Sequence, residues 1–435
     1  MKRSDVLIVI LFAICSTGVN AQLKLNVEIR PRAEMRDGYK QLSDTLALPA
    51  FFISQRSRLA FGFTKEKYKV YFAIQDVRVW GDELNYSSTG ISGDNASIDL
   101  KEAWAEYFFS DQFSMRFGRQ ELKYADQRLL GGRNWNQHGM SYDALLFKYK
   151  GNFTCDVGLS YSNNKELVYQ EIYSPDKMKT LNFVFLKNEL TNKLTGSMIY
   201  VLSGFQNPDK AESIYFKSTP GIILEYSTVN LELSGSCYYQ FGRNKEGANV
   251  SAYFWNLRTD YSFVHLSFAA GLDYISGHNY ASVDSAYLKT EHLFDLLYGA
   301  RHRYYGHMDY FSNLPKGTAG GGLIDTYFDA TFNIMNKLSL KTAYHYFRLQ
   351  NNVLDPEYPE LRSVLNKSLA NEVDLMLSYK PSKDLMIEIG YAFLISAESL
   401  NNIQNISGDH PKDAHWIWFT CKINPSVILS KNEGN

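Results

Sequence analysis

The chain contains 435 residues, of which 15% are aromatic, and it carries a formal net charge of −1 at pH 7. A charge so close to zero provides neither the basic surface that nucleic-acid binding requires nor an acidic tail, so no nucleic-acid partner is predicted. The 31 Tyr and 27 Phe residues, with a mean hydropathy of −0.29, are typical of a chain that is half lipid-facing and half wet rather than of two or three soluble domains.

Residues 1–21 have the pattern of a secretory signal peptide. Lys2 and Arg3 precede an apolar run at residues 6–14, and Ala21 ends an Ala-type cleavage site. The run is too short to span a bilayer, so we expect cleavage after Ala21 and export from the cytoplasm. The rest of the sequence has no run of about 18 apolar residues and therefore offers no transmembrane helix.

Three cysteines follow the predicted signal peptide, and they are scattered. Cys155, Cys237 and Cys421 each lie inside an apolar alternating segment. An odd, dispersed set predicts neither a disulfide framework nor a metal cluster, and we interpret these residues as small apolar wall residues.

Apolar and polar side chains alternate along residues 23–36. Leu25, Val27 and Ile29 occupy every second position, with Asn26 and Glu28 between them. A period of two places the apolar set on one face of a strand and the polar set on the other, whereas a helix would mix them. The same alternation recurs in segments near residues 51–64, 68–79, 102–107, 153–161, 231–241, 251–257, 264–274, 324–334, 338–346, 369–379, 385–395 and 415–423.

The connections between these segments alternate in length. Short ones lie near residues 65–67, 192–193, 336–337 and 381–384, and long ones near residues 81–97, 125–142, 163–178, 276–322, 350–367 and 397–414. With weaker candidates near residues 116, 146, 185, 198 and 223, the count reaches about eighteen strands, which suits the ~9–11 residues that a tilted strand needs to cross a bilayer.

These features predict an all-β fold. Residues 22–424 are expected to form a single transmembrane antiparallel β-barrel of about eighteen strands, with short periplasmic turns and long extracellular loops, followed by a C-terminal tail at residues 425–435. A closed barrel pairs every backbone group in lipid and leaves no open edge. Two soluble β-sandwiches are the alternative, but they do not explain aromatic strand ends such as Tyr161 and Tyr239.

Arginine is concentrated in one part of the chain, because ten of the seventeen arginines lie between Arg30 and Arg133. Alternation places most of them on the polar face, which is the lumen of a barrel. Guanidinium groups pair with carboxylate or phosphate bidentately and keep their charge, so an arginine-lined constriction would select anions. Neighbouring acids make self-neutralising ion pairs the alternative. The candidate pore-lining residues of this region are Arg30, Arg32, Arg56, Arg58, Arg78, Arg119, Arg128, Arg133, Glu102 and Glu121.

A second dense segment, residues 297–310, interleaves tyrosines with His and Arg. Such residues are suited to stacking on sugar rings and binding hydroxyl or carboxylate groups, and a loop here could fold into the mouth of a barrel. Its candidate binding residues are His302, Arg303 and Asp309. A metal site that adds His307 has no supporting spacing. A hydrolase built around His302 and Asp309 is an alternative, although no nucleophile motif is present, so no catalytic residue is predicted.

Several of these stretches resemble a known family. Residues 118–122 and 124–131, followed by Trp135 and residues 142–144, resemble the alginate-export family of outer-membrane porins. Residues 76–81 and 298–309 are similar to other characteristic stretches of its Bacteroidetes-type members. The resemblance covers nearly the whole chain after the signal peptide, and it implies an eighteen-stranded barrel with an electropositive, arginine-rich pore for an anionic polysaccharide.

The resemblance also implies roles for particular residues. It makes Arg78, Arg119 and Arg128 candidates for the pore lining, with Asp126 and Asp143 as their tethering partners. We expect Gly118 to permit a β-bulge that changes the alternation next to Arg119. Met140 and Ala125 depart from the family pattern, which usually has an arginine and a glycine there, and the missing arginine weakens the case for alginate itself.

The sequence therefore predicts a passive outer-membrane channel for an anionic or carbohydrate solute, with an acidic polysaccharide such as alginate as one candidate. No cofactor and no metal are predicted. The expected partners are outer-membrane lipid, the solute, and the barrel assembly machinery during biogenesis. A general small-solute porin with paired lumen charges and, less favoured, a barrel hydrolase are the alternatives. The direction of transport and the oligomeric state stay open.

Overall fold

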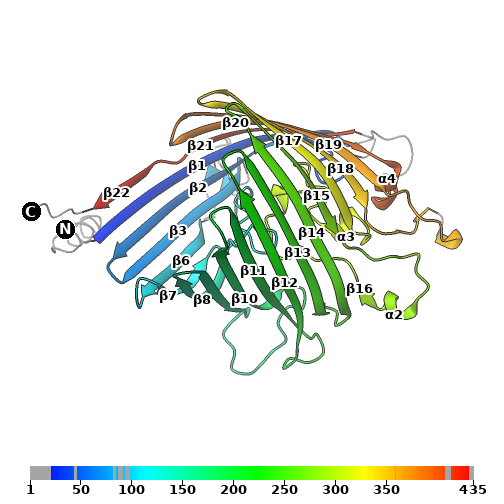
Figure 1. Ribbon diagram of the computed structural model, residues 1–435, viewed down its shortest axis with the longest axis horizontal. Helices are drawn as coiled ribbons and strands as arrows, with labels where there is room; N and C mark the ends of the chain where they lie inside the picture. Colours follow the sequence, from blue (N-terminus) through cyan, green and yellow to red (C-terminus); the bar gives the residue numbers. More distant parts are fainter. Residues whose placement is uncertain are drawn as a thin grey trace, which may run out of the picture.

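The computed structural model describes residues 21–43, 47–81, 85–86, 92–93, 98–357, 359–406 and 413–430. These residues form a closed antiparallel β-barrel of eighteen strands, as the alternation predicts (Figure 1). Apart from Ala21, the predicted signal peptide lies outside the described residues. Among the residues that are described, no helix is long and apolar enough to cross a membrane.

The first nine wall strands cover the N-terminal half of the chain. Their bounds are β1 (Ala21–Asp37), β2 (Ala50–Lys65), β3 (Tyr68–Val79), β6 (Ile98–Phe108), β7 (Phe113–Gln120), β8 (Tyr142–Lys150), β9 (Thr154–Tyr161), β10 (Met178–Glu189) and β11 (Leu194–Gln206). Each pairs antiparallel with the next, with a register shift between Ala73 and Ile74 where β3 meets β6.

The second nine wall strands complete the ring. They are β12 (Ile214–Ser227), β13 (Leu231–Arg243), β14 (Asn249–Ser262), β15 (Leu266–Ile275), β17 (Leu323–Met335), β18 (Leu338–Leu349), β19 (Ser368–Ser382), β20 (Leu385–Ser396) and β21 (Asp413–Ile423). β21 pairs with β1 and closes the barrel. Pairing with β1 then resumes over β22 (Ser426–Ser430), which lies in the segment that the sequence analysis assigns to the C-terminal tail.

The remaining elements are short and lie in the connections. They are β4 (Asn85–Tyr86), β5 (Ser92–Gly93), β16 (Thr290–Glu291), α2 (Ser285–Leu288), α3 (Leu314–Gly317), α4 (Glu398–Ile403), η1 (Arg301–Arg303) and η2 (Pro359–Leu361). η1 and α3 both belong to the long connection between β15 and β17, which carries the second dense segment of the sequence.

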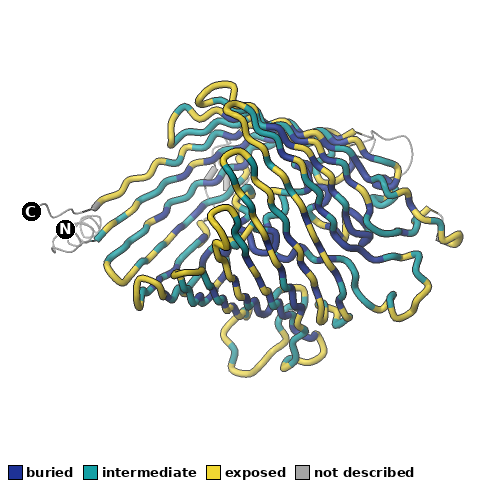
Figure 2. The backbone as a smooth tube through the Cα atoms, in the orientation of Figure 1, coloured by how far each residue is buried: buried dark blue, intermediate teal, exposed yellow. Residues whose placement is uncertain are grey.

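The period-two pattern of each strand divides it between the two sides of the wall. On β1, Glu28, Arg30 and Glu34 face inward and are buried, whereas Ile29 and Met35 face outward and are 44% and 39% exposed. Figure 2 shows this alternation along the strands of the ring. Outward apolar side chains suit lipid, and ring closure satisfies the backbone donors and acceptors that lipid cannot.

The two ends of the barrel differ in the length of their connections. At one end, neighbouring strands are joined by turns such as residues 66–67 and 336–337, and Gln22 pairs there with Ser430. Long connections at the other end include residues 121–141, 276–322 and 350–367. Because outer-membrane barrels have short periplasmic turns and long extracellular loops, the short-turn end is periplasmic.

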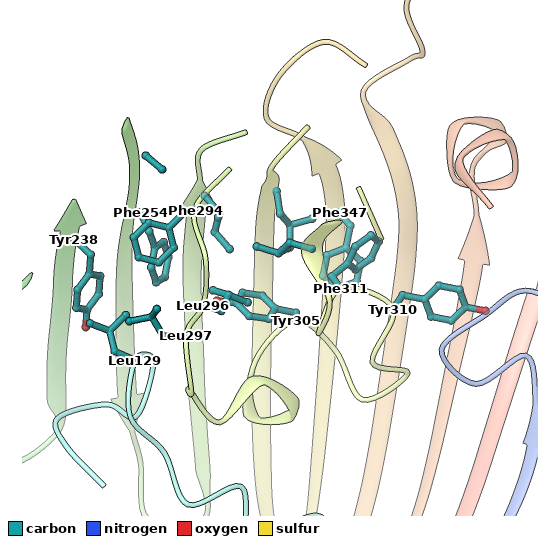
Figure 3. Close-up of a cluster of buried hydrophobic side chains, with 14 of the residues drawn as sticks. Leu129, Tyr238, Phe254, Phe294, Leu296, Leu297, Tyr305, Tyr310, Phe311 and Phe347 are labelled. Atoms are coloured by element: carbon teal, nitrogen blue, oxygen red, sulfur yellow. The ribbon is translucent and has the colours of Figure 1, made fainter. Parts of the chain in front are cut away.

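Two of the long connections fold into the barrel instead of outward. We call residues 121–141, between β7 and β8, the first lumen segment, and residues 276–322, between β15 and β17, the second lumen segment. Their apolar side chains pack against inward-facing wall residues, as Figure 3 shows for Phe294 against Phe254 and for Phe311 against Phe347. The ring centroids of these pairs are 5.5 Å and 4.4 Å apart. Burial of these aromatics holds the lumen segments inside the barrel.

Candidate pore constriction

The two lumen segments pack together through their backbones. The amide of Tyr298 donates to the carbonyl of Leu129 at 3.0 Å, and the amide of Gly131 donates to the carbonyl of Tyr298 at 3.2 Å. The amide of Ala300 donates to the carbonyl of Gln127 at 2.8 Å. The segments therefore form one inward-folded unit across the lumen rather than two independent loops.

Glycines make this close approach possible. A Cβ atom at Gly299 would collide with the carbonyl group of Arg128, and a Cβ atom at Gly131 would lie 2.7 Å from the amide nitrogen of Ala300. Left-handed backbone also recurs here at non-glycine positions, including Ala125 at φ +48°. Such conformations cost about 1–2 kcal/mol for an L-residue and persist where the surroundings impose them.

Arginines of the N-terminal strands anchor the first lumen segment. Arg30 donates to the backbone carbonyls of Asn134, Trp135 and Asn136 at 2.9, 3.2 and 3.0 Å. Arg56 binds the Glu28 carboxylate through Nε at 2.7 Å and the Asn134 side-chain oxygen at 2.9 Å. These arginines face the lumen, as the alternation predicts, but the segment covers them.

Arg32 contributes a third anchor by a different contact. Its guanidinium lies 4.0 Å above the ring of Trp135 and donates to the Glu34 carboxylate at 2.8 Å. Because Arg30, Arg32 and Arg56 are 9%, 6% and 0% exposed, they hold the segment in place and do not line open space.

Arg128 and Arg133 join the first segment to the second and to the wall. Arg128 donates to both carboxylate oxygens of Asp273 on β15, at 2.5 and 2.9 Å, and lies 3.8 Å from the centroid of the Tyr304 ring. Nε of Arg133 donates to the carbonyl of Gly299 at 2.8 Å. Asp126 lies 3.3 Å from Nε of Arg128. Arg128 and Asp126 are brought together as expected, with Asp273 as the closer partner.

Carboxylates of the wall fix the second lumen segment. The imidazole Nδ1 of His307 lies 2.7 Å from the Asp374 carboxylate on β19, and the Met308 amide donates to Glu372 at 2.7 Å. Gly306 allows this contact, since a Cβ atom there would collide with the carboxylate of Glu372. These contacts press residues 306–308 against the wall.

His302 and Asp309 form a pair within the second segment. Nδ1 of His302 lies 3.0 Å from the Asp309 carboxylate, and the His302 ring packs on the Trp135 ring with their centroids 3.6 Å apart and their planes tilted by 30°. The Tyr39 hydroxyl donates to the other oxygen of Asp309 at 2.7 Å. Burial lowers the pKa of His302 below its usual value despite the nearby carboxylate, so the imidazole is neutral at pH 7. Among the described residues, no group of three or more His, Cys, Asp or Glu side chains could hold a metal ion.

Two cavities meet at this unit. One, of about 730 Å³, reaches from the periplasmic turn at Asn192 to the second lumen segment. The other, of about 570 Å³, extends from Glu388 near the periplasmic end of β20, past the same segment, to Lys40 in the extracellular connection between β1 and β2. Four residues line both cavities: His302, Arg303, His307 and Lys341. These four side chains therefore lie where the two cavities adjoin.

Cations outnumber acids both at the junction, which is the set of four residues shared by the two cavities, and in the second cavity, which we call the outer cavity. Arg303 is exposed, Lys341 on β18 is half-buried, and neither forms an ion pair with any described residue. The outer cavity is lined in addition by Lys40, Arg133 and Arg301, against the two acids Asp309 and Glu388. Unpaired cations at a narrow passage attract anions while neighbouring acids limit how tightly they are held.

The remaining predicted residues lie elsewhere. Arg58 and Glu102 face the lumen, where Arg58 donates to the Gln75 side chain at 2.7 Å and Glu102 accepts from the indole of Trp104 at 3.2 Å. Glu121 forms an ion pair with Lys101, with 3.2 Å between the carboxylate oxygen and the ammonium nitrogen. These residues stabilise the lumen wall below the first segment.

Arg119 and Asp143 require a correction. Arg119 donates to Asp143 at 2.8 and 3.1 Å, but the pair lies on the outer face of the wall. Phe117, on the same side of β7, is 49% exposed, while the inward-facing Gln120 is fully buried. The pairing of β6 with β7 is regular through Gly118, so the expected bulge is absent and the alternation never changes.

Arg78 is corrected for the same reason. Arg78 pairs with Gln55 on β2, the neighbour of Arg56 in the chain. Side chains alternate between the two sides of a strand and Arg56 faces the lumen, so Gln55 and its partner Arg78 face outward. The Arg78 guanidinium donates to the Asp76 carboxylate at 2.7 and 3.0 Å, and that carboxylate is also on the outer side of β3. The outward position follows from the period of two, which the density of charge in this stretch had obscured.

The sequence pattern did not single out Lys341 or Lys40, and it included Arg301 only as a member of the dense segment at residues 297–310. A signal for Lys341 was present, because it alternates with Leu340 and Thr342 on a strand whose other face is apolar. Arg301 and Lys40 lie in connections, where alternation carries no information about direction. Their positions depend on how the lumen segments fold.

The fold and this constriction define a porin-like outer-membrane β-barrel. Residues 21–160 match the family model described as alginate export, which confirms the resemblance over that part of the chain. No curated protein matches the chain by sequence.

Solved structures agree on the fold. The chain is 12% identical to Acinetobacter baumannii OccAB1, with a TM-score of 0.61 over 93% of this chain and 97% of that one. It is 13% identical to Pseudomonas aeruginosa OccK3 (OpdO), with a TM-score of 0.60 over 94% and 96%. It is 10% identical to P. aeruginosa OpdK, solved with vanillate, with a TM-score of 0.58 over 93% and 99%. The barrel and the family match together indicate an outer-membrane protein.

Proposed function

We propose that the protein is a passive outer-membrane channel for anionic or carbohydrate solutes, with its selective point where the two cavities meet. The observation that carries this proposal is the placement of Arg303 and Lys341, which line both cavities and have no acidic partner among the described residues. An acidic oligo- or polysaccharide such as alginate is one candidate solute, supported by the family match at residues 21–160. Insertion into lipid would depend on the barrel assembly machinery.

The cationic junction replaces the arginine ring that the sequence favoured. Arg30, Arg32 and Arg56 are occupied in anchoring the first lumen segment, so they shape the passage without offering free charge to a solute. The charge available to a solute comes from residues that the segments expose, above all Arg303. Trp135 in the second cavity, and Tyr304 and Tyr327 in the first, would add flat surfaces for sugar rings.

A second candidate, a general small-solute porin, is favoured by a specific observation. Many lumen charges are paired, including Arg116 with Glu106 at 2.6 Å and Lys148 with Asp156 at 3.3 Å. Paired charges below the junction would exert little selection of their own. The two candidates differ in whether Arg303 and Lys341 discriminate between solutes.

Current blockade by oligosaccharides separates the two candidates. Acidic uronate oligosaccharides and neutral glucose oligosaccharides of equal length are added in turn to the protein in a planar bilayer, and blockade events are counted. We expect more frequent blockades by the uronates, reduced by Arg303→Gln and Lys341→Gln. Arg119→Gln removes an arginine from the outer face and serves as the matched control. Equal blockade by both sugars would support the general porin instead.

A further inference from the structure

Ion pairs on the two sides of the lumen have opposite stoichiometry. On β1 and its neighbours, one carboxylate serves two cations: Glu34 pairs with Arg32 and Arg36 at 2.8 and 2.7 Å, and Glu28 pairs with Arg56 and Lys422. Each of these groups of three carries a net charge of about +1 at pH 7, because one carboxylate cannot neutralise two cations.

On the other side, one cation serves two carboxylates. Arg258 on β14 pairs with Asp260 at 2.7 Å and with Asp329 on β17 at 2.8 Å. Arg128 of the first lumen segment pairs with Asp126 at 3.3 Å and with Asp273 on β15 at 2.5 Å. Each of these groups carries a net charge of about −1 at pH 7.

The positive and negative groups lie across the barrel from each other. Since consecutive wall strands are neighbours, β2 and β14 are well separated in both directions around the eighteen-strand ring. Asp295 of the second lumen segment departs from this division, because Lys217 and Arg301 share it near the extracellular end of β12. The positive groups lie against the first lumen segment, where Arg32 and Arg56 donate to residues 134–135, and the negative groups line the first cavity.

The first cavity, which has a volume of about 730 Å³ and reaches the periplasmic turn at Asn192, combines both signs of charge within reach of one small molecule. The carboxylate-rich groups around Arg258 and Arg128 line it, and so do Arg303 and Lys341, which form no ion pair with any described residue. Lys341 pairs in the sheet with Thr331, one step along β17 from Asp329 on the same face, and forms no ion pair with it. A solute with one negative and one positive end could satisfy the two kinds of group at once.

We propose that this cavity favours small zwitterionic solutes, which carry a carboxylate and an ammonium group a few ångströms apart. The carboxylate would bind Arg303 and Lys341, and the ammonium group would bind the group formed by Asp260, Arg258 and Asp329. This inference rests on the channel function proposed above. It specifies that the preferred solute carries a positive group in addition to a negative one. Charges of opposite sign within one cavity align such a dipole, whereas a neutral solute of equal size gains nothing from them.

Swelling of proteoliposomes tests the inference. The probes are glutamine, a zwitterion, and xylitol, an uncharged molecule of similar size. We expect glutamine to enter about threefold faster than xylitol, a ratio typical of a modest exposed charge interaction. Asp260→Asn leaves Arg258 paired with Asp329 alone and should reduce the ratio to near one. Asp143→Asn, on the outer face of the wall, is the control and should leave the ratio unchanged.

The outcomes separate this inference from the channel function. If xylitol enters but glutamine has no advantage, or if Asp260→Asn keeps the wild-type ratio, the zwitterion preference is overturned and the channel stands. If neither solute enters, the channel function itself fails. Heat-modifiable electrophoretic mobility confirms that each variant barrel is folded, and Asp329→Asn provides a second variant of the same group.

Discussion

Substitution of Gly299 by alanine should separate the two lumen segments and widen the passage. The position has no room for a side chain, because a Cβ atom would collide with the carbonyl oxygen and carbon of Arg128. Both obstacles are backbone atoms, so no side-chain rotation relieves the collision. The backbone of one segment must move away from the other.

The size of the effect follows from the contacts that hold the segments together. Separation breaks the hydrogen bonds between Tyr298 and Leu129, between Gly131 and Tyr298, and between Ala300 and Gln127. At about 1 kcal/mol for each hydrogen bond, the free energy that favours the associated segments over the separated ones falls by about 3 kcal/mol. An equilibrium between associated and separated segments would shift by about two orders of magnitude.

Single-channel recording in planar bilayers measures the consequence. We expect Gly299→Ala to raise the conductance and the current noise, while the urea midpoint of barrel unfolding changes little because the wall strands are untouched. Gly62→Ala is the matched control, since a Cβ atom at that wall glycine would have its nearest neighbour, the Lys24 Cβ, at 3.7 Å. Wild-type conductance and noise in Gly299→Ala would refute the account of how the segments close the lumen.

Further predictions concern the anchors and pH. Arg56→Gln leaves the buried carboxylate of Glu28 with one cation fewer and should lower the free energy of unfolding by about 2–3 kcal/mol in urea titrations. Arg119→Gln breaks only an exposed pair at the extracellular end of β7 and β8 and should cost less than about 1 kcal/mol in the same titrations; a larger loss would contradict this exposed position. Burial lowers the pKa of His302 in the folded protein below the usual 6.5, so its packing is fully stable above pH 6.5 and weakens as the pH falls towards the lowered pKa. Current noise should therefore rise on acidification, and His302→Gln should show a smaller rise; equal pH dependence in both proteins would exclude His302 as the cause.

The wall of the barrel could be predicted from the sequence because strand alternation is local information. A period of two in residues 23–36 already assigns Glu28 and Arg30 to one face and Ile29 to the other, and the structure agrees. Connection length likewise distinguished the two ends of the barrel. Each of these inferences needs only the residues of one strand or one turn.

The constriction could not be predicted in the same way, since it depends on contacts between distant parts of the chain. Nothing near Arg30 shows that residues 134–136 will cover it from more than a hundred positions away. Arg119 was misplaced for a different reason, because a bulge was assumed at Gly118 where the register is regular. The left-handed φ of Ala125 does agree with a family pattern that usually has glycine there.

The most direct test of the account is the reversal potential of the open channel under a potassium chloride gradient. Arg303 and Lys341 lie at the meeting point of the two cavities and have no acidic partner in the described part of the chain, so they predict a preference for chloride over potassium. The double variant Arg303→Gln, Lys341→Gln should lose most of that preference, while Arg119→Gln should retain it. A wild-type channel that prefers potassium, or a double variant with the wild-type reversal potential, would contradict the central claim.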